Sequence, residues 1–265
     1  MNDFTDPARE LAEVCDKLTE SNGTIGGKFL ATKFSVEPDS FEFFQIIYCI
    51  VERIDFLLSI LSSIELDDDY REDAAKHLRE LKKAFSNQSL ASSWSSMGKK
   101  FVSKENIQPI KMLSAQVRAK ISYPKLTDEQ IQDLLNDIDL LLTWLHEHQL
   151  SEQDFIRQAI IEGLEHLQFR LSCLSWLGWG FSQKALKEVI GAYLLLHHTI
   201  SHNQNSLPEA NAVLMKVSSF LEKANSRIKW AKDVHGSAKF LLELYGGAHI
   251  IGDVTSAVAG LLTKQ

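Results

Sequence analysis

The sequence predicts an all-α fold, a multi-helix bundle of about nine helices. Apolar residues recur at steps of three and four over most of the chain, between residues typical of helix caps. Strand signals are scarce, because only residues 27–36 alternate between apolar and polar side chains, which predicts a short hairpin or an irregular segment there. With 45% hydrophobic and 24% charged residues and only 5 prolines in 265 residues, the composition is that of a globular protein.

In the N-terminal half, the segment after Ser40 is the most apolar predicted helix. It carries Phe41, Phe44 and Phe56 among isoleucines and leucines, and we expect these aromatic side chains to face the core. A charged helix is predicted over 67–85. The serine-rich residues that follow, 86–96, predict a loop or a short helix that serves as a mobile connection.

The C-terminal half shows the clearest caps and apolar stripes. Thr127 and Gln130 have the spacing of a capping box, and leucines at helical steps follow. Trp176 to Phe181 interrupts the helices with two glycines and predicts a compact aromatic corner. We divide the chain into an N-terminal region, 1–125, and a C-terminal bundle, 126–265; a single continuous domain is the alternative.

Charge is distributed unevenly along the chain. Residues 76–125 hold 11 basic and 2 acidic residues, a net charge of +9, whereas residues 1–75 carry −11 and residues 126–166 carry −9. The basic segment could bind anionic lipid or nucleic acid, or it could dock against the acidic helices on either side. The candidates for contact with an anionic surface are Lys82, Lys83, Lys99, Lys100, Lys104 and Lys111.

The three cysteines and the N-terminus favour a cytoplasmic location. Cys15, Cys49 and Cys173 are far apart, lie in apolar patterns and lack the spacing of a metal site, which suits a reducing compartment. The first residues include no charged-then-apolar leader, so no secretion signal is expected. Attachment to a membrane surface on activation is the alternative.

Catalytic motifs are weak. The chain has neither a serine elbow nor a phosphate-binding glycine loop, and we expect no small-molecule substrate and no cofactor. Arg71 and His77 have a spacing that resembles the active-site signature of HEPN ribonucleases, which are small helical bundles. The resemblance implies that this pair would act on a scissile phosphate and its 2′-hydroxyl group.

A metal site is a further alternative. His198 and His202 lie one helical turn apart, as metal ligands on helices do. A histidine at a helix C-terminus also complements the helix dipole without a metal, so the leading expectation is that no metal is bound.

The segment 237–262 differs from the rest because it combines glycine, alanine and branched aliphatic residues with few charges. It could be a buried terminal hairpin, a surface that contacts a second copy or a partner, or a hairpin that inserts into a bilayer. The proposed contact residues are Phe240, Leu241, Leu244, Tyr245, Ile250, Ile251, Val254, Val258 and Leu261, together with Trp176 and Trp179 of the aromatic corner.

The leading hypothesis is a non-enzymatic helical protein that assembles with itself or binds a partner through this C-terminal segment, in a bacterial multi-component system. One alternative is a membrane-active effector whose C-terminal hairpin, 237–263, inserts into a bilayer. The other is a HEPN-like ribonuclease.

Overall fold

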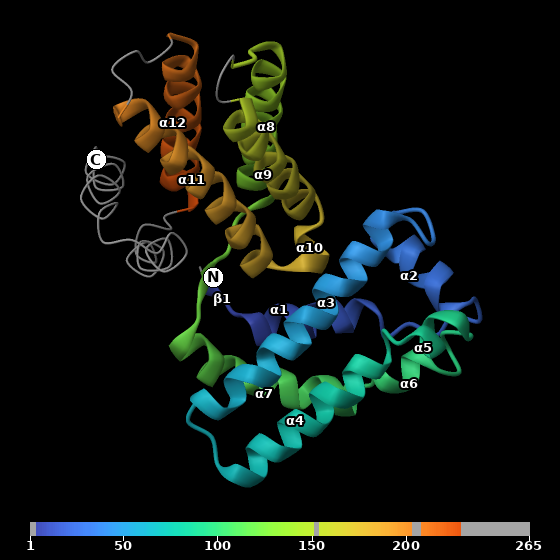
Figure 1. Cartoon of the computed structure of the whole chain (residues 1–265). Helices are drawn as coiled ribbons and strands as arrows, with labels where there is room; N and C mark the ends of the chain where they lie inside the picture. Colours follow the sequence, from blue (N-terminus) through green and yellow to red (C-terminus); the bar gives the residue numbers. More distant parts are fainter. Residues whose placement is uncertain (1–3, 151–153, 203–207, 229–265) are drawn as a thin grey trace. The chain divides into compact units, whose positions relative to one another are not determined.

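The computed structural model describes residues 4–150, 154–202 and 208–228 (Figure 1). It confirms the all-α fold, and the described residues include nine helices of seven or more residues. These helices are α1 (Pro7–Lys17), α2 (Gly26–Phe34), α3 (Phe41–Ile60), α4 (Asp68–Lys83), α7 (Lys104–Lys120), α8 (Asp128–Glu147), α9 (Asp154–Ser172), α11 (Trp179–His202) and α12 (Pro208–Ile228).

Shorter elements connect them. These are α5 (Asn87–Ala91), α6 (Gly98–Phe101), α10 (Leu174–Leu177) and the 3₁₀ turn η1 (Leu61–Ser63). The two-residue strands β1 (Phe4–Thr5) and β2 (Tyr123–Pro124) pair antiparallel. They join the two ends of the 1–125 region.

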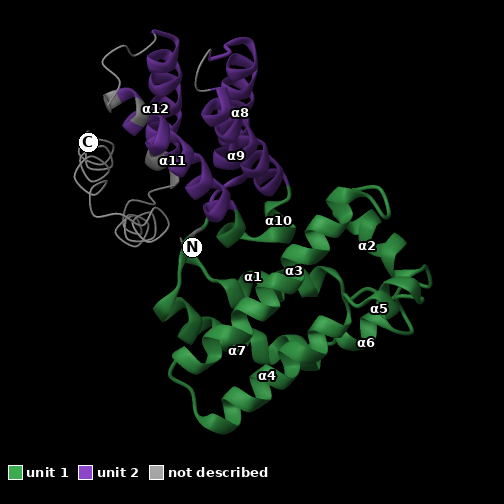
Figure 2. Ribbon diagram, viewed as in Figure 1, with its two compact units in different colours: residues 1–125, 173–181 green, residues 126–172, 182–265 purple. Residues whose placement is uncertain are grey.

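The chain forms two compact units (Figure 2). Unit 1 comprises residues 1–125 and 173–181, and unit 2 comprises residues 126–172 and 182–265. In unit 1, α7 packs against α1 and α4. Helix α3 also contacts α1 and α4. In unit 2, α8 packs against α9 and α12.

A buried carboxylate joins the first and last long helices of unit 1. Asp6 is the N-cap of α1, and its Oδ1 accepts a hydrogen bond of 2.9 Å from the backbone N–H of Arg9. Its Oδ2 accepts hydrogen bonds from Ser114 Oγ at 2.6 Å and from Arg118 on α7 at 3.2 Å. Because Asp6 is fully buried, these donors replace the water that the charge gives up.

The expected hairpin or irregular segment at 27–36 is wrong, because these residues lie mainly in helix α2. Phe29, Leu30 and Phe34 follow a helical spacing and are all buried, so packing outweighs the alternation that suggested a strand. Gly26 begins the helix, where an added Cβ would lie 2.3 Å from the carbonyl oxygen of Ser89. The glycine therefore allows α2 and α5 to approach each other closely.

The serine-rich residues 86–96 contain the expected short helix, α5, and most of them are exposed or half-buried, but Ser89 and Trp94 are fully buried. Trp94 is fully buried, stacks on Phe29 with ring centroids 5.0 Å apart, and donates from its indole Nε1 to the carbonyl oxygen of Leu18 at 3.2 Å. The backbone N–H of Trp94 also donates to Thr24 O at 2.9 Å. A tryptophan with both a stacking partner and a satisfied N–H anchors the surrounding serines.

Unit 2 contains α8, α9 and α12 and most of α11. The capping box is confirmed, since Thr127 Oγ1 accepts from Gln130 N and the Gln130 side chain accepts from Thr127 N. Arg157 is 5% exposed and donates to Leu145 O at 2.7 Å, which ties the end of α8 to α9. Its guanidinium also pairs with Asp154.

Candidate interaction surface

Helix α3 has two apolar faces, and only one of them is buried. The buried face consists of Phe43, Ile46, Ile47, Cys49, Ile50, Arg53, Ile54 and Leu57. On the other face, Phe41 is 77%, Phe44 50% and Tyr48 63% exposed. We call these three residues the aromatic stripe. Phe56 is 38% exposed, but it lies about 80° around the helix from Tyr48 and does not belong to the stripe.

The expectation that Phe41, Phe44 and Phe56 face the core is therefore wrong. At 3.6 residues per turn, a helix that buries residues 43, 46, 50 and 57 turns residues 41, 44 and 48 to the opposite side. The segment contains more aromatic residues than one face can bury. Phe43 alone among its phenylalanines is nearly inaccessible, at 1% exposed.

The spacing within the stripe is that of a helix-packing seam. Phe41, Phe44 and Tyr48 lie three and four residues apart, so their side chains are neighbours along the helix. Val51, the next residue at this spacing of three and four, is half-buried. This is the arrangement of a and d positions in a heptad, which insert between the side chains of a facing helix.

The surface around the stripe is acidic. Residues 37–60 contain five acidic residues, Glu37, Asp39, Glu42, Glu52 and Asp55, and one basic residue, Arg53. Arg53 is 5% exposed, so it contributes little to the surface charge. Asp55 is paired with Lys82 of α4, with Nζ 2.7 Å from Oδ1.

The opposite face of α3 is fixed by a buried ion pair. Arg53 NH2 lies 3.8 Å from Glu10 Oε2 of α1, and the two side chains are 5% and 13% exposed. Arg53 NH1 donates to the carbonyl oxygen of Trp176 at 2.9 Å. The Glu10 carboxylate accepts from the backbone N–H of Trp179 at 3.2 Å. One ion pair thus holds α1, α3 and residues 173–181 together.

Burial dominates the electrostatics of this pair. Loss of hydration raises the pKa of Glu10 from 4.5 to about 7, against the opposing effect of the Arg53 charge. Burial also lowers the pKa of Arg53, which Glu10 partly counteracts. Within the described residues, Arg53 NH2 and Trp179 Nε1 are buried without a hydrogen-bond acceptor. The pair is therefore held in place at an energetic cost.

A glycine makes the geometry of this corner possible. Gly178 has a φ of +79°, which residues with a side chain rarely adopt. A Cβ at this position would lie 2.5 Å from Glu10 Oε2 and 3.0 Å from Arg53 Cζ. Only a glycine lets the chain pass this close to the ion pair.

The predicted aromatic corner is therefore part of the interior of unit 1. Trp179 is 3% exposed. Trp176 is half-buried, with its ring 4.9 Å from that of Phe34 and Lys17 Nζ 4.9 Å above it. Trp179 fills the core rather than forming a surface, which leaves Trp176 as the partly accessible residue of the two proposed contacts.

Replacing Glu10 by glutamine should flatten the pH dependence of stability. Since the folded pKa lies above the ordinary value, the neutral carboxyl is favoured in the folded state. Its stabilising contribution is complete below about pH 4.5 and is lost as the pH rises through about 7. As the pH rises over that interval, the free energy of unfolding of Glu10→Gln should increase by about 3 kcal/mol relative to that of the wild type. Urea titrations at several pH values measure it, and a constant difference between the two proteins would contradict it.

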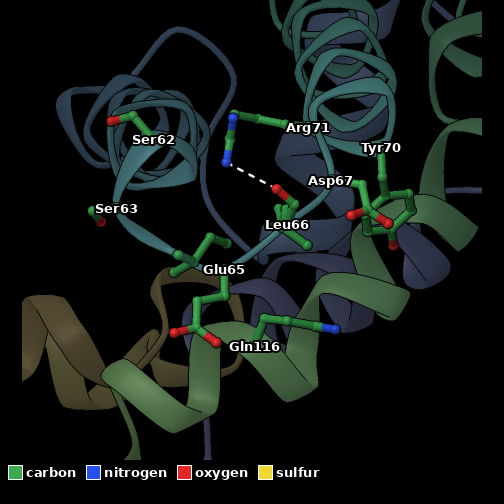
Figure 3. A pocket seen from close by; sticks show the side chains of 9 residues that line it. Ser62, Ser63, Glu65, Leu66, Asp67, Tyr70, Arg71 and Gln116 are labelled. Carbon is green, nitrogen blue, oxygen red and sulfur yellow. Dashed lines mark hydrogen bonds between the residues drawn. The ribbon is translucent and has the colours of Figure 1, made fainter.

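A separate hollow of about 730 Å³ lies between the α3–α4 connection and α7 (Figure 3). Its lining is mostly polar and includes Glu65, Asp67, Tyr70, Arg71 and Gln116. Tyr70 donates to the carbonyl oxygen of Pro109 at 3.4 Å. The Oε1 atom of Gln116 is buried and accepts no hydrogen bond from a described residue.

Arg71 lines this hollow, but its guanidinium is occupied by the chain itself. NH2 donates to Leu66 O at 2.9 Å (Figure 3). Nε donates to Leu61 O at 3.1 Å, and NH1 pairs with Asp68. Arg71 therefore closes the turn between α3 and α4.

His77, the second residue of the HEPN-like spacing, does not line the hollow. Its Nδ1 lies 2.8 Å from Asn106 Oδ1, and its Nε2 lies 3.4 Å from Asp73 Oδ1. The structure thus places Arg71 beside the end of α3 and His77 beside the start of α7. It does not bring the two side chains to one pocket.

Three of the six lysines proposed to bind an anionic surface are paired within unit 1. Lys82 binds Asp55, Lys83 binds Glu80, and Lys111 binds Asp16 with Nζ 2.7 Å from Oδ2. Two of these three partners lie in residues 1–75, which agrees with the docking alternative for the basic segment.

The other three lysines of the set form no ion pair with another described residue. They are Lys99, Lys100 and Lys104. Lys99 and Lys100 belong to α6, and Lys104 begins α7. Lys100 Nζ lies 5.8 Å from the centroid of the Phe101 ring. These three lysines lie on neighbouring elements, and anion binding through them stays a prediction.

The two-histidine metal site stays a prediction. His198 lies on α11, and the side chain of its partner His202 lies outside the described residues. Elsewhere in the described chain, no three histidine, cysteine or carboxylate side chains are grouped as metal ligands.

The proposed C-terminal contact residues, Phe240 to Leu261, lie outside the described residues as well. Among the residues that are described, no helix combines the length and apolar character required to cross a membrane. Comparison with known proteins finds no match to any family model, curated protein or solved structure.

The aromatic stripe is the feature that the sequence interpretation missed. The signal was present, because Phe41, Phe44 and Tyr48 share one helical face and Phe43, Ile46 and Ile50 share the other. The sequence interpretation did not assign each apolar residue of this helix to a face, so it expected both groups to face the core.

Proposed function

We propose that this chain is a non-enzymatic helical interaction protein and that the aromatic stripe of α3 is a partner-binding surface. The observation that carries the proposal is the exposure of Phe41, Phe44 and Tyr48 at helix-packing spacing. Soluble domains rarely leave several large aromatic side chains together on one face without a binding role.

The rigidity of α3 supports the same function. Ser40 caps the helix by accepting from Phe43 N at 3.1 Å, and the buried face is packed along its length. Arg53 ties the middle of the helix to α1 and to residues 173–181. A helix held this firmly can present aromatic side chains to a partner with little loss of conformational entropy on binding.

The C-terminal segment remains a second proposed contact of the same protein. Its composition of glycine, alanine and aliphatic residues favours close helix packing. The observation that favours an assembly function from the described part of the chain is the aromatic stripe, and it does not depend on residues 237–262.

Substitution of Phe44 and Tyr48 by serine should weaken partner binding without unfolding the protein. Both side chains are at least half exposed, so the free energy of unfolding should change by less than about 1 kcal/mol. Truncating two aromatic contacts at the centre of an interface should weaken binding by at least about tenfold. Quantitative co-purification, followed by titration of the purified partner, measures the loss.

The matched control is Leu140→Ser/Met215→Ser, because these residues of unit 2 are 71% and 74% exposed and lie outside the stripe. The control should retain the partner that Phe44→Ser/Tyr48→Ser loses. Equal recovery with all three proteins would remove the aromatic stripe from the proposal.

A further inference from the structure

We infer that the partner segment recognised by the aromatic stripe is a basic amphipathic helix that lies along α3. This inference rests on the proposed function and adds the chemistry of the partner. Two properties of the described residues carry it: the spacing of the stripe and its charge.

The spacing selects a helix. Phe41, Phe44 and Tyr48 project from a single α-helix at steps of three and four, and the next residue in this series is Val51. Side chains at these steps fit between those of a second helix, whose own apolar residues repeat with the same period. An extended peptide would need an unpaired strand edge, and the surface of α3 has none.

The charge selects a basic partner. The stripe is bordered by the acidic residues of segment 37–60, and the only basic residue of that segment is buried against Glu10. Lys82 compensates Asp55 from α4. The negative charge that we expect a partner to meet beside the stripe is therefore that of Glu37, Asp39 and Glu42. Lysine or arginine beside the apolar seam of a partner helix would complement the remaining negative charge, whereas acidic residues there would be repelled.

The same charge argues against a second copy of this chain as the occupant. Two α3 helices facing each other would bring their acidic residues together and repel each other. A single partner helix avoids this repulsion.

Synthetic helices test the inference directly. We would use a set of three-heptad peptides that share leucine at the apolar positions and differ only at the flanking positions, which are lysine, glutamine or glutamate. A fourth peptide keeps the lysines and has alanine at the apolar positions. Fluorescence anisotropy with the full chain gives the dissociation constants.

The lysine peptide should bind at least about tenfold more tightly than the glutamate peptide, with the glutamine peptide between them. The alanine peptide should bind weakly, because charge alone does not fill the seam. In Glu37→Lys/Glu42→Lys the preference should reverse, and in the unit 2 control Glu129→Lys/Glu147→Lys it should not. Added salt should reduce the difference between the peptides.

The outcomes separate the two claims. If Phe44→Ser/Tyr48→Ser weakens every leucine peptide equally and charge has no effect, the aromatic stripe binds helices but the basic partner is wrong. If this variant changes no dissociation constant, both claims fail at this surface. An apparent mass that rises with protein concentration, but does not rise in Phe44→Ser/Tyr48→Ser, would identify a second copy as the occupant instead of a partner helix. Flotation with anionic vesicles that the same variant loses would identify lipid as the occupant.

Discussion

Arg53→Met is expected to lose about 3 kcal/mol of unfolding free energy at pH 8 and much less at pH 5. At pH 8 the substitution leaves the Glu10 carboxylate buried without its counter-charge, which is the costly way to break a buried pair. It also removes the hydrogen bond to Trp176 O. At pH 5 Glu10 is mostly protonated, because its pKa is about 7, so less charge is left uncompensated. Denaturant titrations followed by circular dichroism at both pH values measure the two losses.

The double variant Glu10→Gln/Arg53→Met provides the control. With both charges removed, most of the loss at pH 8 should be recovered, since replacing a buried pair by neutral groups of similar size is often close to neutral. A loss for Arg53→Met that is equal at pH 5 and pH 8, or a double variant as unstable as the single one, would contradict this description of the pair.

Trp94→Ala is expected to cost about 4 kcal/mol, a loss typical of a large buried aromatic side chain. Trp94 is fully buried, stacks on Phe29 and binds Leu18 O through its indole. Gly98→Ala should also destabilise the protein, because an added Cβ would lie 2.1 Å from the Trp94 ring. Urea denaturation of full-length variants measures both effects.

Gly23→Ala is the matched control for the glycine substitution, since a Cβ at this position meets nothing within 4 Å. It should leave stability nearly unchanged. In the double variant Trp94→Ala/Gly98→Ala the added methyl group should no longer clash, so the two losses should not add. Additive losses would mean that residue 98 does not press on the Trp94 ring.

The fold class and many helix boundaries follow from local signals in the sequence. The capping box of Thr127 and Gln130 satisfies backbone groups within a few residues, so its geometry depends little on the rest of the chain. Segment 27–36 shows the limit of this reasoning. Its alternation suggested a hairpin, but it is a helix whose Phe29 and Phe34 pack on the distant Trp94 and Trp176.

The sites depend on contacts that are remote in the sequence. Glu10, Arg53 and Trp179 are separated by more than forty residues at each step, and nothing in the local pattern of any of them indicates a shared ion pair. Trp94 lay in a serine-rich stretch whose composition suggested a loop, and its burial depends on Leu18 and Phe29. The aromatic stripe could be predicted from helical periodicity, but its exposure depends on which face of α3 packs against α1 and α4.

Photo-crosslinking in the native cell tests the central claim most directly. A benzophenone amino acid would replace Phe44 in the stripe or, as a control, Met112 on α7, which is 57% exposed. The claim predicts a discrete crosslinked product from position 44 and none from position 112. It also predicts that the attached peptide comes from a helix with apolar residues at heptad spacing and lysine or arginine beside them. The absence of any product from position 44, or the same products from both positions, would contradict it.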